Sequence, residues 1–416
     1  MPQTIEVVVR MTISEEDFDV NRLEERAKQA GDEVGRQLLV QALEVLDAMA
    51  LEAHPGAVRQ RRVERGLDTT LGPIRFQRWQ VKKEGKASYL LDRLLGLERS
   101  SRVTPAVKRR ASELAAQMTY REAARILREE LETPVSAQSV HEWIQQMGAQ
   151  VEARELAGPT REEAAPEVVV AELDDTMVRS QEPGREKFAL KLGIAYTQKR
   201  QAAKKRWVLA DKVVYGGEEA PEKFAERFYA RVEGPLGVEA AAHVVVKGDG
   251  AEWIHQVAAQ VFPRHVFQLD RWHLLERITA FAGALPRLLK RLQRWVYQGR
   301  AAALIRSLRH LVGADARSEE ARQELLGYVT RHAQAITAVD RLRPQVSPAS
   351  RVLLTHGTGA MEKNIEIFIA RRFKRWGMRW TRRGAHHLLK VRLWIFRHRG
   401  HWFEALKPST SQLTNT

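Results

Sequence analysis

The sequence predicts a mixed α/β layer fold for the C-terminal part of the chain, with a mostly helical region before it. Three segments rich in β-branched residues follow one another, and two more then alternate with helical patterns. This order is typical of a sheet with helices packed on it. The expected strands are residues 167–173, 187–196, 205–214, 242–247 and 265–269. The helices expected between the last three strands are residues 222–232 and 251–262.

The N-terminal hundred residues are expected to begin with a short strand at residues 4–11. Ser14 and the acidic residues after it are typical of a helix start, and apolar residues at spacings of three and four continue the helical pattern to about residue 52. Residues 72–92 form two aromatic and basic segments around "KEGK", which predicts a β-hairpin. We assign residues 1–100 to this helical arm and hairpin.

Residues 104–148 are expected to form three helices. Pro105 suits a first helical position, "TYRE" has the form of a capping box, and Ser136 restarts the chain after a turn. Such a set resembles a helix-turn-helix, in which the last helix enters the major groove of DNA. The groove-facing residues of this predicted domain, 101–156, would be Gln138, Ser139, His141 and Glu142. An ordinary three-helix packing unit explains the same pattern.

Changes in composition mark the remaining boundaries. "AGPTREEAAP" at residues 157–166 is expected to be a linker, and residues 165–400 the main α/β domain. Continuous helical periodicity predicts a helical region within that domain at about 276–350. Residues 361–400 are again helical and very basic, and residues 401–416 are expected to be a tail.

The balance of charges narrows the class of partner. Lys and Arg number 68 against 52 Asp and Glu, a net charge of +16, which favours a polyanion such as nucleic acid. The absence of cysteine excludes disulfides and thiolate metal sites. No apolar run approaches the roughly 20 residues that span a bilayer, and the N-terminus lacks a signal-peptide pattern. We therefore expect a cytoplasmic protein without a membrane partner; a basic enzyme with no nucleic-acid site is the alternative.

Single acids stand where three of the expected strands end. Asp174 follows the first strand of the α/β region in "VVVAELDDT", Asp249 follows the fourth and Asp270 the fifth. Because neighbouring strands lie about 4.8 Å apart, acids at their ends can converge on one ion. Gly248 and Gly250 let the backbone turn sharply around Asp249. Ligation by oxygen alone suits Mg²⁺ or Mn²⁺, whose partner is commonly a phosphate.

Each of these acids, taken alone, has an ordinary structural explanation. Asp249 between two glycines is typical of a turn, and Asp270 is a good N-cap for the helix that follows. Asp175 stands beside Asp174, so either one can be the first ligand of a metal. The metal site is favoured because all three acids occur in one basic region of the chain.

A further acid is expected from the basic segment near the C-terminus. Glu362 starts a helix after a glycine-rich turn, and Glu366 one turn later is its competitor. Stabilisation of the helix dipole by an acid in the first turn also explains Glu362. The residues after it that are expected to contact DNA are Arg371, Arg372, Lys374, Arg375, Trp376 and Trp380. For the two tryptophans, burial in a core is the alternative.

Four segments, "ELDDT", "VKGDGAEWI", "LDRWHLLERI" and "GAMEKNIEIFIARRFKRWGMRW", together resemble the DDE transposases of bacterial insertion sequences, most closely the ISLre-type group. The resemblance extends over most of residues 70–400. It implies a ribonuclease H-like mixed sheet with a helical insertion before the last acid, preceded by a mostly helical region that contains a helix-turn-helix. In that group a Gly usually follows the catalytic Asp of the first motif, and Asp175 occupies this position here.

The resemblance implies that Asp174, Asp249 and Glu362 hold two Mg²⁺ (or Mn²⁺) ions. "DRWH", Asp270 to His273, is similar to a signature that organises such sites, so His273 either touches the scissile phosphate or holds Asp270. The implied activity is cleavage and strand transfer of double-stranded DNA, at the element's ends and at a target, by a DNA-bound homodimer at the bacterial nucleoid. A nuclease or resolvase without strand transfer and a non-catalytic DNA-binding regulator are the alternatives.

Overall fold

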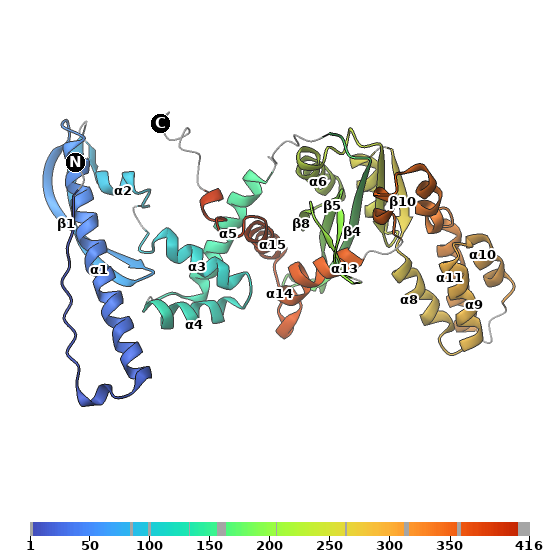
Figure 1. Cartoon of the computed structure of the whole chain (residues 1–416), viewed down its shortest axis with the longest axis horizontal. Helices are drawn as coiled ribbons and strands as arrows, with labels where there is room; N and C mark the ends of the chain where they lie inside the picture. The colour runs from blue at the N-terminus through green and yellow to red at the C-terminus, as the bar shows by residue number, and fades with distance from the viewer. Residues whose placement is uncertain are drawn as a thin grey trace. The chain divides into compact units, whose positions relative to one another are not determined.

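The computed structural model describes residues 3–83, 86–98, 101–132, 134–155, 164–204, 206–262, 264–311, 316–355 and 359–406 (Figure 1). The chain divides into two compact units, Met1–Ile144 and Gln145–Thr416, and the division falls inside helix α5 (Ala137–Arg154). The centre of the expected linker, the tip of the expected "KEGK" turn and the tail after residue 406 lie outside the described residues.

The first unit begins with a long helix packed on a three-stranded antiparallel sheet of order β1-β2-β3. Helix α1 (Val20–Glu52) begins after Asp19, whose carboxylate accepts a hydrogen bond from the backbone N–H of Asn21. The strands are β1 (Val58–Thr69), β2 (Gly72–Lys83) and β3 (Lys86–Ser88), and the short helix α2 (Leu90–Leu94) follows them. The core between these elements contains Leu43, Leu67, Ile74, Phe76 and Leu91.

The strand expected at residues 4–11 is wrong, because these residues form none, and the helical pattern from Ser14 is divided into a 3-10 turn (Glu15–Asp17) and α1. The expected hairpin is confirmed by the antiparallel pairing of β2 with β3, although its second strand is short and Leu90–Leu94 is helical. A strand that was not expected, β1, pairs with nearly the whole of β2. The sequence of β1, "VRQRRVERGLDT", lacks the alternation of apolar and polar residues that predicts a strand, because its first half is exposed and rich in arginine.

Three helices follow, as expected: α3 (Pro105–Ala115), α4 (Tyr120–Leu131) and α5. The Thr119 hydroxyl accepts a hydrogen bond from the backbone N–H of Glu122 at 3.1 Å, which caps α4. The Ser136 hydroxyl accepts from the N–H of Ser139 at 3.0 Å and caps α5 in the same way. The expected helix starts are therefore confirmed, while their use in DNA binding stays a prediction.

The second unit is built on a five-stranded mixed sheet of order β10-β9-β4-β5-β8 (Figure 1). Its strands are β4 (Val168–Arg179), β5 (Lys187–Tyr196), β8 (Val213–Gly217), β9 (His243–Gly248) and β10 (His265–Leu269). β4, β5 and β8 pair antiparallel in chain order, whereas β4, β9 and β10 run parallel. The mixed α/β class predicted from the sequence is confirmed.

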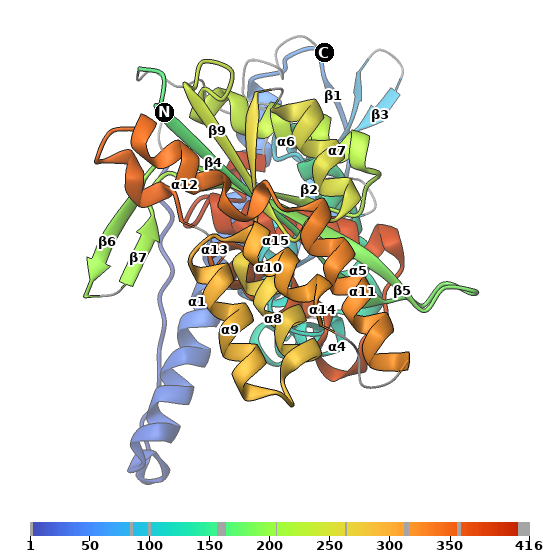
Figure 2. The same cartoon turned by 90° about the vertical axis from the view of Figure 1, so that its right-hand side faces the viewer.

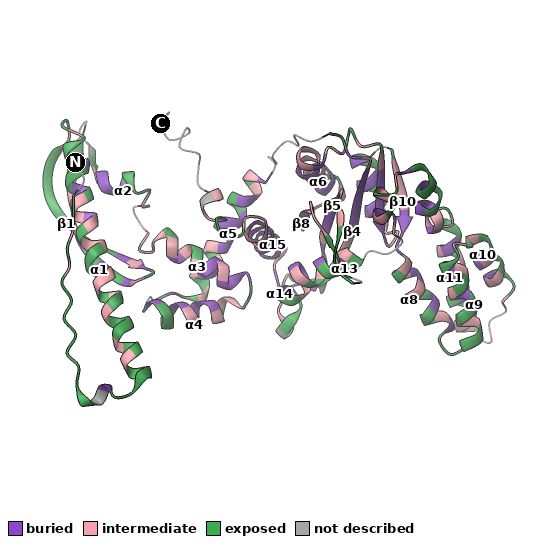
Figure 3. Ribbon diagram, in the orientation of Figure 1, coloured by how far each residue is buried: buried purple, intermediate pink, exposed green. Residues whose placement is uncertain are grey.

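Helices α6 (Pro221–Leu236) and α7 (Glu252–Val261) pack on one face of this sheet. The core between them includes Leu173, Val246, Phe228 and Ile254, and Figure 3 shows the central strands as almost wholly buried. The single strand expected at 205–214 is wrong: β7 (Arg206–Leu209) pairs with β6 (Lys199–Ala203) in a separate hairpin, and β8 starts at Val213.

A helical region follows β10, as the sequence predicts. It contains α8 (Arg271–Ala282), α9 (Pro286–Tyr297), α10 (Ala301–Arg309), α11 (Ala316–Arg331) and α12 (Ala338–Leu342), and much of it packs around a core of its own (Figure 2). The chain then returns to the sheet in α13 (Gly359–Ile365), a π-helical turn (Glu366–Ala370), α14 (Arg371–Phe373) and α15 (Arg382–Arg397). None of the helices in the described ranges is long and apolar enough to cross a bilayer.

Candidate active site at the carboxyl ends of three parallel strands

Three acids form a row across the adjacent parallel strands β4, β9 and β10. Asp174 was expected to follow the first strand, but it lies within β4, because pairing with β5 extends that strand to Arg179. Lys247 in β9 is level with Glu172 in β4 and with Gln268 in β10. Two residues after Glu172, Lys247 and Gln268 in the sequence stand Asp174, Asp249 and Asp270, respectively. The backbone N–H of Asp270 donates to the carbonyl of Gly248 at 2.8 Å, which continues the alignment past the last paired residues. With about 4.8 Å between strands, the row brings the three acids together.

The alternation of β4 separates Asp174 from Asp175. Leu173 points into the core beneath α6 and α7, so Asp175 lies on that face too. There burial and the charge of Asp249 raise the pKa of Asp175, while Lys191, which stands opposite it on β5, and the Trp253 indole lower it. Asp174 lies on the other face, together with Glu172. The geometry therefore favours Asp174 as the ligand facing the last helices of the chain.

Glu172 connects this face of β4 to α13. Its carboxylate accepts hydrogen bonds from the Tyr196 hydroxyl at 2.7 Å and from the backbone N–H of Met361 at 2.9 Å. Lys247 lies 3.9 Å from it and is fully buried. Sequence reasoning gave no role to Glu172 or Lys247, although the period of two in "ELDD" places Glu172 on the same side as Asp174.

Glu362 follows Met361 in the sequence, so its backbone adjoins the hydrogen bond between Met361 and Glu172. Partial desolvation raises the pKa of Glu362, and the negative charge of Asp270 raises it further, while His273 opposes the effect. Glu362 and its competitor Glu366 are both exposed, but Glu366 pairs with Arg371 at 3.1 Å. Glu362 is therefore the acid of this helix that shares electrostatic neighbours with the row.

His273 joins the row from the first turn of α8. Its Nδ1 lies 2.6 Å from a carboxylate oxygen of Asp270, which is fully buried and also accepts from the backbone N–H groups of Trp272 and His273. The hydrogen bond with Asp270 raises the pKa of His273, and the charges of Asp174 and Asp249 contribute in the same direction. Asp270 thus caps the helix, as its sequence position suggested, and also holds the imidazole.

The row carries more negative charge than its surroundings neutralise. Burial raises the pKa of Asp174 to about 7; the backbone N–H of Asp175 and His273 oppose this, and Asp249 adds to it. Carboxylates of this kind are suitable ligands for Mg²⁺ or Mn²⁺, and a cation would relieve their repulsion. The ligand atoms of Asp174, Asp249 and Glu362 do not all lie within 4.8 Å of one another, so these side chains do not form a closed metal site as they stand.

Gly250 shapes the turn after β9. Its φ of +87° lies in the left-handed region that favours glycine, and a Cβ there would meet the His332 ring at 2.7 Å. Gly248 was expected to help the same turn, but its φ is not positive; instead a Cβ would meet Ile254 at 2.7 Å. One glycine therefore permits the turn that carries Asp249, and the other permits close packing of α7.

Residues 13–406 match a family described as an uncharacterised protein family, UPF0236. The chain belongs to the UPF0236 family. A UPF0236 protein of Caldanaerobacter subterraneus subsp. tengcongensis is 24% identical over 386 residues, which cover 90% of this chain and 78% of that protein. A second protein of the same organism, 23% identical over 90% of this chain and 78% of its own length, has a name that joins eleven locus designations. A UPF0236 protein of Streptococcus gallolyticus is 24% identical over 89% of this chain and 81% of its own length.

A second charged cluster of this UPF0236 protein lies away from the row. Among the described residues, Glu152, Glu219 and His386 are the one set of three whose possible metal-ligand atoms all lie within 4.8 Å. Arg227 already pairs with both glutamates, at 2.8 Å from Glu219. His386 Nδ1 accepts from the backbone N–H of Glu218, and burial lowers the pKa of His386 to about 3, so the neutral ring carries its proton on Nε2. We therefore read this cluster as an ion pair that fixes α5, α6 and α15.

The residues predicted to bind DNA are only partly accessible. Arg371, Lys374 and Arg375 are exposed. A direct DNA contact is wrong for Arg372 and Trp380, because they are only 1% and 6% exposed and the guanidinium stacks on the indole at 4.9 Å. The side chain of Trp376 lies outside the described residues. In α5, Gln138 is exposed and bonds to Glu142, Ser139 is half-buried, and the His141 ring packs edge-on against Tyr120.

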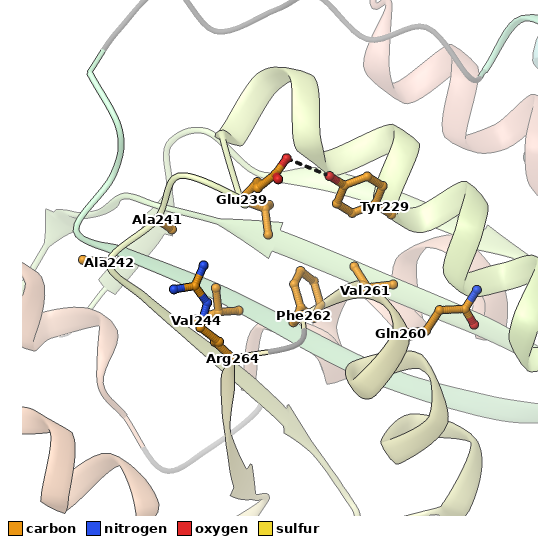
Figure 4. Close-up of a pocket in the computed structure, with 10 residues that line it drawn as sticks. Tyr229, Glu239, Ala241, Ala242, Val244, Gln260, Val261, Phe262 and Arg264 are labelled. Atoms are coloured by element: carbon orange, nitrogen blue, oxygen red, sulfur yellow. Dashed lines mark hydrogen bonds between the residues drawn. The ribbon is translucent and has the colours of Figure 1, made fainter.

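A cavity of about 340 Å³ lies at the opposite edge of the sheet (Figure 4). It is lined by residues that precede β9 and β10, among them Glu239, Ala242, Phe262 and Arg264, whereas the acids follow these strands. Tyr229 and Glu239 are hydrogen-bonded across it at 3.4 Å. None of the residues predicted from the sequence to be functional lines this cavity.

Proposed function

We propose that this UPF0236 protein is a DDE-type DNA transposase that binds the ends of an insertion sequence and transfers DNA strands with the help of Mg²⁺ or Mn²⁺. The observation that carries the proposal is the meeting of four separate segments at one edge of the sheet. Asp174, Asp249, Asp270 and Glu362 share His273 as an electrostatic neighbour, although 188 positions separate the first from the last.

The topology of the sheet supports a ribonuclease H-like fold. A three-stranded antiparallel meander is extended on the side of its first strand by two parallel strands, each preceded by a helix. This is the arrangement expected of that fold, and the helices from α8 to α12 occupy the place of the expected insertion before the last acid. The helices α3, α4 and α5 are proposed to be a helix-turn-helix that reads the DNA.

Asp174, Asp249 and Glu362 are the proposed metal ligands. Bound cations would supply an activated water or hydroxyl and neutralise charge on the phosphodiester. Asp270 is placed too deeply to reach a substrate, so its proposed part is to position His273, which is half-buried. Double-stranded DNA, as element ends and as target, is the proposed partner, and two protomers are proposed to join two ends in the bacterial cytoplasm.

The relatives add a second line of support. One UPF0236 protein has a name that joins eleven locus designations of one organism. Recurrence of one protein at many loci is what an element that moves through a genome would leave. Because the present chain belongs to the same family, we propose that it too is encoded by a mobile element.

Strand transfer with the whole protein tests the proposal. A labelled duplex that carries the DNA flanking the gene is incubated with a target plasmid and Mg²⁺ or Mn²⁺. We expect nicking and joining of its 3′-hydroxyl end to the plasmid, and we expect Asp174→Asn, Asp249→Asn and Glu362→Gln each to abolish both. Glu366→Gln is the matched control and should remain active. Cleavage without joining would favour a nuclease or resolvase, and activity retained in the Asp174 variant would refute the site.

A further inference from the structure

The helical region after β10 contains a long stretch without any acidic residue. Between Arg277 and Leu311 the chain has eight Lys or Arg residues and no Asp or Glu. In a chain with 52 acidic residues, such a stretch gives one part of the surface a strongly positive potential. This stretch includes helix α9 and helix α10, neither of which has a part in the site described above.

Helix α9 separates its apolar and cationic residues onto two faces. Leu292 and Val296 are buried in the core of the helical region, and Leu288, Leu289 and Trp295 pack against it. The opposite side carries Arg287, Lys290, Arg291 and Arg294, all exposed. At 100° per residue these four cations fall within about 100° of the helix circumference. We name this set the α9 stripe.

No acid among the described residues pairs with the α9 stripe. Some exposed cations elsewhere in the chain have such partners: Arg110 pairs with Glu130 at 3.0 Å, for example. Four neighbouring like charges without counter-ions repel one another, and a polyanion would remove this cost. The stripe extends over eight residues, Arg287 to Arg294, a length of about 10 Å, or roughly three phosphate positions along one strand of a duplex.

The stripe leads toward the acid row. Helix α8 begins directly after Asp270, and α9 packs back along it, so that the ring of Tyr297 at the end of α9 lies 5.6 Å from the guanidinium of Arg271. Arg294 stands one turn before Tyr297. A backbone that follows the stripe from Arg287 to Arg294 would therefore approach the residue that adjoins Asp270.

From this geometry we propose that the α9 stripe binds the phosphate backbone of duplex DNA and guides it to the acid row. The inference rests on the proposed function only for the cleavage of the bound DNA. The binding itself is inferred from the charge of the α9 stripe and from its position beside the acid row. Helix α10 adds Arg306 and Arg309, both exposed, on the next helix.

Salt-dependent binding of the whole protein tests the stripe. The variant Lys290→Gln, Arg291→Gln, Arg294→Gln is titrated with a 30-base-pair duplex of mixed sequence between 0.05 and 0.3 M salt. Each lost phosphate contact should reduce the slope of log K against log salt by about 0.9, so three reduce it by about 2.7 and weaken binding roughly 100-fold near 0.15 M. An unchanged slope and affinity would overturn the inference.

The matched control removes the same charge elsewhere on the second unit. Arg200 and Lys204 are exposed in the β6–β7 hairpin, which follows the end of β5 that pairs with the start of β4, and Arg264 is exposed just before β10. Their triple change to Gln should leave the slope within about 1 of the wild-type value. An equal loss in both triple variants would show only a general effect of net charge and would overturn the inference.

A crosslink locates the DNA without changing the stripe. Because the chain has no cysteine, Gln298→Cys introduces a unique thiol one turn beyond Arg294, and Gln345→Cys provides the control at the opposite edge. A duplex with a thiol tethered to one phosphate should form a disulfide with the first variant and not with the second. Equal capture by both, or binding of phosphatidylglycerol vesicles in preference to the duplex, would refute the proposal.

The two proposals can fail separately. If the protein binds DNA through the stripe but neither cuts nor joins it, the proposed function fails and the binding surface remains. If the Asp174 variant loses cleavage while the stripe triple variant binds and cuts like the wild type, the proposed function remains and this inference fails.

Discussion

Replacing Asp174 by Asn should stabilise the metal-free protein at alkaline pH and remove its response to Mg²⁺. Burial, and then the charge of Asp249, raise the pKa of Asp174 from its ordinary 3.8 to about 7. Between these values the folded protein holds a proton that the unfolded chain has released. The stability that this group contributes is therefore complete below about pH 4 and is lost as the pH rises to about 7.

The size of the effect follows from the same two pKa values. A rise from 3.8 to about 7 corresponds to about 4 kcal/mol at about 1.4 kcal/mol per unit. Since water and local rearrangement soften such costs, we expect Asp174→Asn to increase the free energy of unfolding by about 2 kcal/mol at pH 8. At pH 4 the wild-type acid is already protonated in the folded state, so the same substitution should change stability much less.

Urea unfolding in EDTA at pH 4 and pH 8 measures both values, and Glu366→Gln serves as the exposed control with an expected change below about 0.5 kcal/mol. Saturating Mg²⁺, at about 100 times its Kd, should then stabilise the wild type by about 2.7 kcal/mol and leave the Asp174 variant unchanged. Equal destabilisation by Asp174→Asn at both pH values would refute the electrostatic reasoning. Undiminished stabilisation by Mg²⁺ in that variant would refute the assignment of the ligand.

Three further predictions concern neighbouring features. In NMR titrations the pKa of the His273 imidazole should lie above its ordinary value of 6.5, and it should fall toward that value in Asp270→Asn. The stability that His273 contributes is complete below about pH 6.5 and is lost as the pH rises through the raised pKa of the folded state. The same pKa in the wild type and in Asp270→Asn would contradict the pairing. Arg227→Met should lower the free energy of unfolding by about 3 kcal/mol, because the buried Glu219 and the half-buried Glu152 lose their cation, whereas Lys223→Met on the same helix should cost below about 0.5 kcal/mol; similar urea midpoints would argue against the cluster. Trp380→Ala should cost about 3 to 5 kcal/mol in the same assay, and a variant of wild-type stability with weakened DNA binding would restore the tryptophan as a DNA contact.

Local chemistry in the sequence determined much of the fold and the composition of the candidate site. The β-branched runs of β9 and β10 are continuous and end in turn residues, so the type and ends of these strands can be predicted from neighbouring residues alone. The start of β4 was predicted in the same way, but its end was not, because pairing with β5 continues the strand through both aspartates to Arg179. The capping hydroxyls of Thr119 and Ser136 act within three residues, and the helix starts were correct for the same reason.

Only the tertiary structure decided which side chains face which surface. The pleat of β4 placed Asp174 on the same face as Glu172, which bonds to the backbone of Met361, and put Asp175 on the opposite face with Leu173, beneath α6 and α7. Packing likewise buried Arg372 against Trp380 within a segment whose charges suggested a surface. Sequence patterns report the preference of each segment, whereas burial and proximity depend on contacts between segments far apart in the chain, and those exist only after folding.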